Sequence, residues 1–373
     1  MSDLEAYVSS FETEPGYLDW AAFGPLSPRV RAEMHADAEL LGTGRRSSID
    51  LVHGHVATAR ELLADLLGAP VDEVVLQPST TYGLMQALYG LRGSILVGRG
   101  EFPSLSVTAA RAAATRDDLR VQWLETEDGW VTPDAVRSAL TDETTAVAVS
   151  LVDFRTGYLA DLTALREVIG DRLLIVDAIQ GFGVTDADYE AADVVCGNGY
   201  KWLRAGRGTG WARFGPRALE RLDPVLSGFG GADVDLPVDV VPGVASTARR
   251  FTVTGADMLA AGRLATGLEE LRDAGVPAVA DAVADRVDEV IGYAERYDIP
   301  VATPLERSRR AGIVALSPDA ADVSRLSAAL VNRAVTFTAR SGLVRLAPHA
   351  GTDDDTMRLL LEGLAAFAAY RAP

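Results

Sequence analysis

The stretch LLIVD at residues 173–177 and the stretch DVVCGNGYK at residues 193–201 decide the architecture of this chain. Each contains an unbroken apolar run, which is typical of a strand buried on both faces of a parallel sheet. Ligands of open parallel sheets bind at the carboxyl ends of the strands. Asp177 ends the first run and Lys201 follows the second, so both are predicted to face one cavity. An Asp177 that only caps a turn, or forms a structural ion pair with Lys201, fits the pattern equally well.

Similar apolar runs recur between residues 60 and 215 and alternate with amphipathic segments. This alternation predicts an α/β domain built on a mainly parallel seven-stranded sheet. The predicted strands are Val74–Gln77, Ser94–Val97, Val121–Leu124, Thr145–Leu151, Leu173–Val176, Asp193–Cys196 and Gly210–Phe214. The predicted helices are His55–Leu67, Thr81–Leu91, Ser104–Thr115, Pro133–Leu140 and Leu162–Ile169.

The pattern changes after an irregular segment, residues 225–249, which is rich in Gly, Pro and acids. Helices at 256–271 and 276–297 precede strand-like runs at 313–316, 335–338 and 343–347. A closing helix begins near Asp353, with Thr352 and Asp355 as a capping box. We therefore expect two domains: a large α/β domain over 16–245, and a smaller α+β domain over 246–373 together with 1–15.

The composition excludes several classes of function. The 373 residues include 35 Lys+Arg and 53 Asp+Glu, a net charge of −18. So acidic a surface repels nucleic acid and anionic membranes. There is no signal-peptide pattern, no apolar run of the roughly 18 residues that span a bilayer, and one cysteine, Cys196. We expect a cytoplasmic protein with small-molecule ligands.

Lysine usage singles out one position. Lys201 is the single lysine among the 35 basic residues. A GC-rich genome explains the replacement of lysine by arginine elsewhere, and a chance survivor remains an alternative. Arginine cannot serve where an amine must lose its proton, because guanidinium stays protonated. Lys201 is therefore a candidate for acid–base or Schiff-base chemistry.

Two other motifs are candidate ligand sites. The run PSTTYG at residues 78–83 follows a predicted strand and opens a helix, where hydroxyls and free N–H groups bind phosphate; an ordinary helix cap would look the same. His53 and His55 have no third metal ligand at a suitable spacing, so no metal is predicted.

In their order along the chain, these segments resemble the class V aminotransferase group of fold type I pyridoxal-phosphate enzymes, which includes cysteine desulfurases and kynureninases. The resemblance spans nearly the whole chain. It rests on YLDWAA at 17–22, the turn after VVL at 74–76, DAIQ at 177–180, GNGYKW at 197–202 and RLAPH at 345–349. It implies pyridoxal 5′-phosphate as cofactor, an amino acid as substrate, and a homodimer with its active site at the interface.

The resemblance also implies a role for each matched residue. Lys201 would bind the cofactor through a Schiff base and move the Cα proton, and Asp177 would keep the pyridine nitrogen protonated. Gln180 would hydrogen-bond the ring oxygen, and Phe102 would stack on the ring. Arg345 would bind the substrate carboxylate through two parallel hydrogen bonds. The phosphate would be held by Thr80, Thr81, Asn198 and Tyr200.

The sequence departs from the family at several points. The desulfurase cysteine before Arg345 is missing, Phe102 replaces a histidine, and kynureninases carry histidine where this chain has Gln180. Residues 254–255 read TG where relatives read GT, at a phosphate contact that a neighbouring subunit would supply. An aminotransferase is the leading prediction. A lyase (kynureninase-like or eliminating), an epimerase, a non-catalytic relative and a nucleotide-binding protein remain alternatives.

Overall fold

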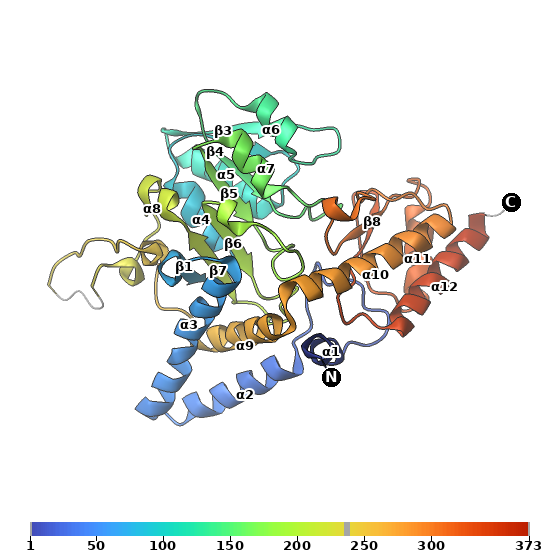
Figure 1. Cartoon of the computed structure of the whole chain (residues 1–373), viewed down its shortest axis with the longest axis horizontal. Coiled ribbons are helices and arrows are strands. Elements are labelled where there is room, and N and C mark those ends of the chain that lie inside the picture. The colour runs from blue at the N-terminus through green and yellow to red at the C-terminus, as the bar shows by residue number, and fades with distance from the viewer. Residues whose placement is uncertain (1, 235–238, 372–373) are drawn as a thin grey trace.

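The computed structural model describes residues 2–234 and 239–371 and contains a seven-stranded sheet layered between helices (Figure 1). Its strands are β1 (Val74–Gln77), β2 (Gly93–Gly98), β3 (Leu119–Leu124), β4 (Thr144–Ser150), β5 (Leu173–Asp177), β6 (Val194–Asn198) and β7 (Gly210–Phe214). Their spatial order is β1-β7-β6-β5-β4-β2-β3. β7 is antiparallel to both neighbours and the other pairs are parallel. The predicted fold class is confirmed.

Both faces of this sheet are covered by helices, which explains the unbroken apolar runs. All five residues of β5 are buried. Leu174 and Val176 pack into one core cluster and Leu173 and Ile175 into the other, as the period of two in a strand requires. One face packs on α3 (Arg46–Leu67), α6 (Pro133–Ala139), α7 (Leu162–Ile169) and α9 (Met258–Ala274). The other packs on α4 (Thr80–Gly90), α5 (Pro103–Thr115) and α8 (Pro216–Arg221).

The C-terminal elements form a lobe beside the large sheet (Figure 1). Its antiparallel sheet has the order β8-β10-β9, with β8 (Val314–Leu316), β9 (Thr338–Arg340) and β10 (Leu343–Leu346). Helices α10 (Val276–Arg296), α11 (Val323–Val331) and α12 (Asp354–Arg371) complete it. The strand predicted at 335–338 starts later, because Thr336 instead exchanges backbone hydrogen bonds with Gly16 and Leu18. This pairing carries the N-terminal segment to the small sheet.

The capping box predicted for the last helix is wrong. Asp353 caps α12, accepting from the Thr356 N–H at 2.7 Å, and Thr352 Oγ1 accepts from the His349 N–H instead. In the irregular segment the structure has two short 3₁₀ turns, η3 (Phe229–Gly231) and η4 (Ala248–Phe251), while residues 235–238 lie outside the described part.

The N-terminal region holds two helices that the sequence pattern did not predict, α1 (Asp3–Ser9) and α2 (Pro28–Gly42). Helix α3 also begins at Arg46, well before the predicted His55. Helices α2 and α3 both pack on α9. No helix within the described residues is long and apolar enough to cross a bilayer.

Candidate active site

Strand register brings the predicted site residues to one edge of the large sheet. Asp177 at the end of β5 pairs with Cys196 of β6. Asn198 at the end of β6 pairs with Gly210, which on its other side pairs with Gln77 at the end of β1. The start of α4 and the loop to Lys201 therefore leave the sheet at neighbouring points.

Lys201 and Asp177 are both buried at this edge, with 6% and 2% of their surface exposed. Burial lowers the pKa of the Lys201 amine and raises the pKa of the Asp177 carboxyl, and the attraction between the two groups opposes both shifts. The Ile179 N–H donates to Asp177 Oδ1 at 3.0 Å and favours its ionised form. Burial thus brings the neutral amine within reach near neutral pH.

The Lys201 amine lies between two aromatic rings. Its Nζ is 5.9 Å from the centre of the Phe102 ring and 5.5 Å from that of Tyr200. Phe102 makes an edge contact with Phe154, and the Arg207 guanidinium lies 4.4 Å over the Tyr200 ring. Aromatic rings therefore lie near the amine, together with the charged groups of Asp177, Arg345 and Arg207.

A cavity of about 310 Å³ opens beside this amine. Five of the predicted residues line it: Phe102, Gln180, Tyr200, Lys201 and Arg345. Its other lining residues are Ala21, Ala22, Phe154, Arg155, Thr338, Arg340, Ser341 and Leu343. Asp177, Thr80, Thr81 and Asn198 are not among its lining residues.

The first turn of α4 presents two hydroxyls with different surroundings. Thr80 Oγ1 is buried and has no hydrogen-bond partner in the described structure. Thr81 Oγ1 is 2.8 Å from Ser104 Oγ. The N–H groups of this turn lack intrahelical acceptors, as at every helix start. An anion beside Thr80 would meet both kinds of donor.

Asn198 and Gln180 are already engaged within the protein. Asn198 Oδ1 accepts from Thr209 Oγ1 at 3.0 Å and from the Tyr200 N–H at 3.2 Å. Gln180 Nε2 donates to Ala21 O at 2.9 Å, and its Oε1 accepts from Trp202 Nε1 at 3.1 Å. An amide nitrogen carries two N–H donors, so Gln180 retains one for a ligand.

Arg345, which also lines the cavity, is fixed by hydrogen bonds within the protein. Its Nη1 donates to Phe154 O at 3.0 Å and its Nη2 to Asp19 Oδ1 at 3.2 Å. Its Nε is buried, with no hydrogen-bond partner among the described residues. The guanidinium is therefore held in place, and its Nε–H remains available as a hydrogen-bond donor.

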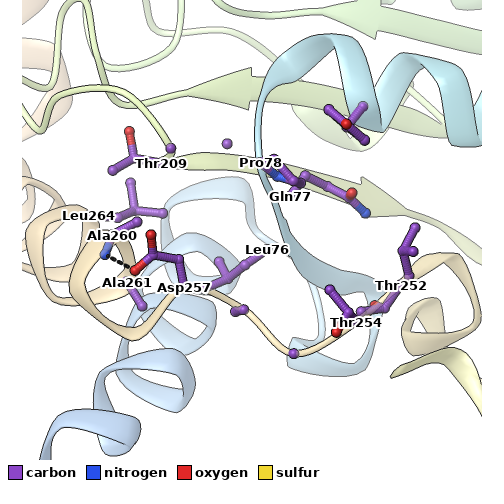
Figure 2. Close-up of a pocket in the computed structure, with 16 residues that line it drawn as sticks. Leu76, Gln77, Pro78, Thr209, Thr252, Thr254, Asp257, Ala260, Ala261 and Leu264 are labelled. Atoms are coloured by element: carbon purple, nitrogen blue, oxygen red, sulfur yellow. Dashed lines mark hydrogen bonds between the residues drawn. The ribbon is translucent and has the colours of Figure 1, made fainter. Parts of the chain in front are cut away.

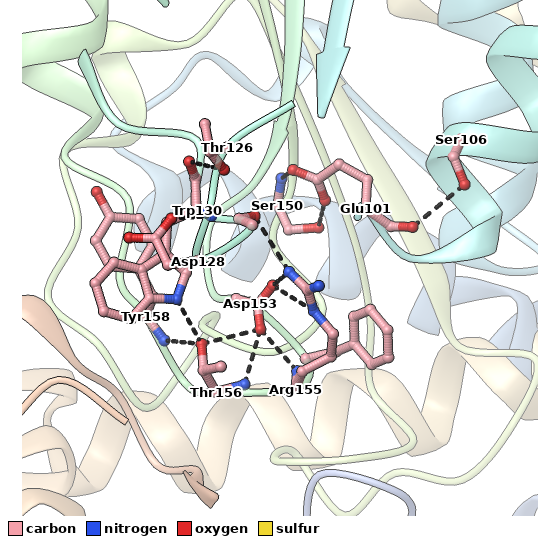
Figure 3. A network of polar contacts seen from close by, with 12 residues as sticks. Glu101, Ser106, Thr126, Asp128, Trp130, Ser150, Asp153, Arg155, Thr156 and Tyr158 are labelled. Carbon is pink, nitrogen blue, oxygen red and sulfur yellow. Dashed lines mark hydrogen bonds and ion pairs between the residues drawn. The ribbon is translucent and has the colours of Figure 1, made fainter. Parts of the chain in front are cut away.

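Sequence reasoning missed the loop that follows β4. Asp153 accepts from the N–H groups of Arg155 and Thr156, and both Nε and Nη2 of Arg155 donate to its Oδ2 (Figure 3). Phe154 and Arg155 of this loop line the cavity. The rule that ligands bind at strand carboxyl ends would have found them, because β4 was predicted.

Glu101, which follows β2, was also missed as a site neighbour. Its carboxyl accepts from the Ser150 N–H at 3.0 Å and contacts the Ser150 hydroxyl (Figure 3). Burial raises its pKa to about 7, although the Ser150 hydrogen bonds lower it. Glu101 thereby holds the turn that carries Phe102 against the end of β4.

A second cavity, of about 300 Å³, lies between the end of β1, the start of β7 and the beginning of α9 (Figure 2). Pro78, Thr254 and Gly255 line it, and it shares no lining residue with the Lys201 cavity. Asp257 caps α9 there, accepting from the Ala260 N–H at 3.1 Å. Thr254 and Gly255 therefore line a cavity that is separate from the Lys201 cavity of the same chain.

The residues present fit a phosphorylated aldehyde cofactor such as pyridoxal phosphate. An amine with a lowered pKa suits the aldehyde, and a buried carboxylate suits a ring nitrogen. The orphaned hydroxyl of Thr80 at a helix start suits the phosphate.

Comparisons with known proteins agree with this fit. The family model Aminotransferase class-V matches residues 16–344. The chain is 25% identical over 84% of both lengths to an uncharacterized aminotransferase, YcbU, of Bacillus subtilis. It is 29% identical to a kynureninase of Deinococcus radiodurans over 66% of this chain and 62% of the relative. It is 31% identical to a cysteine desulfurase, IscS, of Ectopseudomonas mendocina over 48% of both.

Solved structures share the fold. A cysteine desulfurase from Thermococcus onnurineus superposes with a TM-score of 0.85 over 95% of both chains at 18% identity. The cystine C-S lyase C-DES superposes with a TM-score of 0.84 over 95% of this chain and 98% of its own, also at 18% identity.

Proposed function

Because the chain belongs to the Aminotransferase class-V family, we propose that it is an aminotransferase that acts on an amino acid through Lys201. It is an enzyme of this pyridoxal-phosphate-dependent family, and pyridoxal 5′-phosphate is its cofactor. The observation that carries the proposal is the buried Lys201 amine beside a cavity that Arg345 also lines.

When bound, pyridoxal phosphate supplies an aldehyde that reacts with amines and a ring that accepts electrons. The protein supplies the rest. Lys201, whose amine keeps a neutral fraction near pH 7 because burial lowers its pKa, would hold the cofactor by its aldehyde and would serve as the base for the substrate Cα proton. Asp177 would keep the ring nitrogen protonated, since a buried carboxylate requires a cationic partner. These two groups are the proposed catalytic residues.

Other side chains orient the cofactor and the substrate. We assign the phosphate to the first turn of α4, with Thr80 and Thr81, and to the loop of Asn198 and Tyr200. Phe102 would pack against the ring and exclude water, and the spare N–H of Gln180 would serve the ring oxygen. We assign the substrate carboxylate to Arg345, whose Nε–H and second Nη1 N–H have no partner among the described residues, whereas its Nη2 donates to Asp19 and Thr338.

Transamination is favoured over the alternatives by the groups available for proton transfer. Cys196, the single cysteine, lies buried in β6, so it cannot serve as a mobile sulfur nucleophile. Phe102 contributes no acid or base over the ring. The Lys201 amine would serve as the acid–base group at the substrate Cα, and transamination requires no sulfur nucleophile. A lyase would need a substrate with its own leaving group.

We also propose a homodimer. Its support is the position of Thr254 and Gly255, which line the second cavity and not the cavity of their own Lys201. Two exposed apolar side chains, Tyr82 and Val253, line the same second cavity. A cytoplasmic location remains part of the proposal.

The test is the fate of the amino group. Purified holoenzyme is incubated with a panel of ¹⁵N-labelled amino acids and a 2-oxo acid acceptor, and products are measured by mass spectrometry. We expect one donor to yield its 2-oxo acid in equal amount to the ¹⁵N-labelled amino acid formed from the acceptor. Lys201→Arg should abolish the transfer. Release of pyruvate and ammonia, or of a cleaved side chain, without labelled acceptor would replace the aminotransferase by a lyase.

A further inference from the structure

Three potential metal ligands meet where α2 crosses α3, away from the Lys201 cavity. Glu33 and Asp37 lie one turn apart on α2, so both project from the same face of that helix. His55 projects from α3. Its Nε2 lies 3.1 Å from Asp37 Oδ1 and 3.2 Å from Glu33 Oε1, and the three ligand atoms all lie within 4.8 Å of one another.

The Asp37 carboxylate is buried without sufficient compensation. Only 1% of the residue is exposed. Oδ1 has a hydrogen bond with His55, whereas Oδ2 is buried and has no hydrogen-bond partner in the described part of the chain. Burying an ionised carboxylate is strongly unfavourable unless it is paired or coordinates a metal. One imidazole, shared with Glu33, leaves the cluster with excess negative charge.

Helix α9 closes the cluster from the third side. A Cβ atom on Gly262 would lie 2.4 Å from Asp37 Oδ2 and 3.1 Å from His55 Cδ2. Any larger residue at Gly262 would therefore displace the carboxylate or the ring. The glycine permits α9 to press these two side chains together in a fixed arrangement.

We propose that Glu33, Asp37 and His55 bind a divalent transition-metal ion of the zinc type. Ligands at about 2.0–2.1 Å from a tetrahedral ion are roughly 3.3 Å apart, close to the separations of His55 Nε2 from the two carboxylate oxygens. The side chains of Glu33 and His55 are 37% and 23% exposed, which leaves a path for the ion and room for a water as fourth ligand. The ion would cross-link α2 to α3 at the point where both helices pack on α9.

Hydrogen bonding alone is the competing explanation. A protonated His55 would pair with both carboxylates, and the cluster would then take up no metal. The two explanations differ in stoichiometry: the metal site predicts one ion per chain, and the ion-pair cluster predicts none at these residues.

The experiment is a titration of metal-stripped holoenzyme with Zn²⁺ by calorimetry and with Co²⁺ by visible absorption. We expect one ion per chain and a higher Tm in the presence of zinc. Asp37→Asn and His55→Gln should each weaken zinc binding at least tenfold and abolish the rise in Tm. The matched controls are His53→Gln on α3 and Glu39→Gln on α2, both exposed, which should bind as the wild type does.

Two outcomes would overturn the site: no zinc uptake by the wild type, or equal uptake by all four variants. If Asp37→Asn fails to fold, X-ray absorption spectroscopy of the zinc-loaded wild type identifies the ligands of the ion. One imidazole nitrogen and carboxylate oxygens around the ion support the site, and a shell without imidazole removes it. Aminotransferase activity does not enter this test, so the two proposals stand or fall separately.

Discussion

Asp19 and Arg345 form an ion pair across 326 residues of sequence, with Asp19 Oδ1 3.2 Å from Arg345 Nη2. The Thr338 hydroxyl contacts both Asp19 oxygens, at 3.0 and 2.9 Å. Burial raises the pKa of Asp19, and the Arg345 guanidinium opposes that shift. The pair holds the guanidinium plane at the cavity wall before any substrate enters.

Arg345→Lys should raise KM for the amino acid about 30-fold with a smaller change in kcat. An ammonium cannot reproduce the planar two-point contact, and the loss of a charge-assisted hydrogen bond is worth about 2 kcal/mol. Steady-state kinetics measure this effect, with the exposed Arg333→Lys as control. If the native enzyme bound amino acids and their decarboxylated amines equally well, Arg345 would have no role in carboxylate binding.

Asp177→Asn should retain cofactor and lower kcat by roughly two orders of magnitude. The isosteric amide keeps an oxygen for the Ile179 N–H but no longer stabilises a protonated ring nitrogen. Electrostatic contributions of this kind are commonly worth about 3 kcal/mol. Single-turnover rates provide the measurement, and the exposed Asp186→Asn is the control. Near-normal turnover would leave Asp177 with a purely structural role.

Thr80→Val should weaken cofactor binding about tenfold, and more than Thr81→Val does. Thr80 Oγ1 is buried without a partner, whereas Thr81 Oγ1 is already bonded to Ser104. A hydrogen bond to a charged phosphate is worth about 1.5–3 kcal/mol. Equilibrium dialysis of the two variants measures the difference. The reverse order of affinities would assign the phosphate contact to Thr81.

Glu101→Gln should change how stability depends on pH. Burial raises the pKa of Glu101 to about 7 from an ordinary value of 4.5, so the folded state binds the proton more tightly than the unfolded state. The resulting stabilisation is full below pH 4.5 and is lost as pH rises through 7. Glutamine mimics the neutral acid at every pH. Between pH 5 and 8 the wild type should therefore lose roughly 2 kcal/mol relative to the variant.

Denaturant unfolding of both proteins at several pH values measures this difference. The exposed Glu125→Gln serves as the control and should follow the wild type. A constant difference between wild type and Glu101→Gln across this range would mean that Glu101 is ionised throughout in the folded protein.

The large sheet and its Lys201–Asp177 edge were predictable because both depend on local signals. Unbroken apolar runs mark strands covered on both faces, and strand ends place the residues that follow them. Helix α2 left no such signal, since Val30 and Asp37 are its only buried residues and its apolar period is faint. The cluster of Glu33, Asp37 and His55 could not be predicted for the same reason. Its two carboxylates lie on α2, a helix that the sequence pattern did not indicate.

The neighbours of Arg345 could not be predicted from the sequence for a different reason. Asp19 and Thr338 meet it only because the N-terminal segment joins the small sheet through backbone bonds at Thr336. No local pattern encodes a pairing between segments so far apart. The predicted domain boundary at residues 245 and 246 also stays a prediction. Helix α9 follows that boundary in sequence, yet it packs on α2 and α3, which precede it.

The final prediction concerns the single lysine. Lys201 carries the only side-chain amine of the chain, so borohydride reduction of the holoenzyme should fix one pyridoxyl group per chain. Burial lowers the pKa of this amine and keeps a neutral fraction available for the linkage. Trypsin does not cut at a modified lysine, so the label should travel on an intact peptide spanning residues 173–204, bounded by Arg172 and Arg204. Unreduced protein should instead give 173–201 and 202–204. Label on the N-terminal amine, or none, would remove Lys201 from the proposed chemistry, whatever the turnover measurements show.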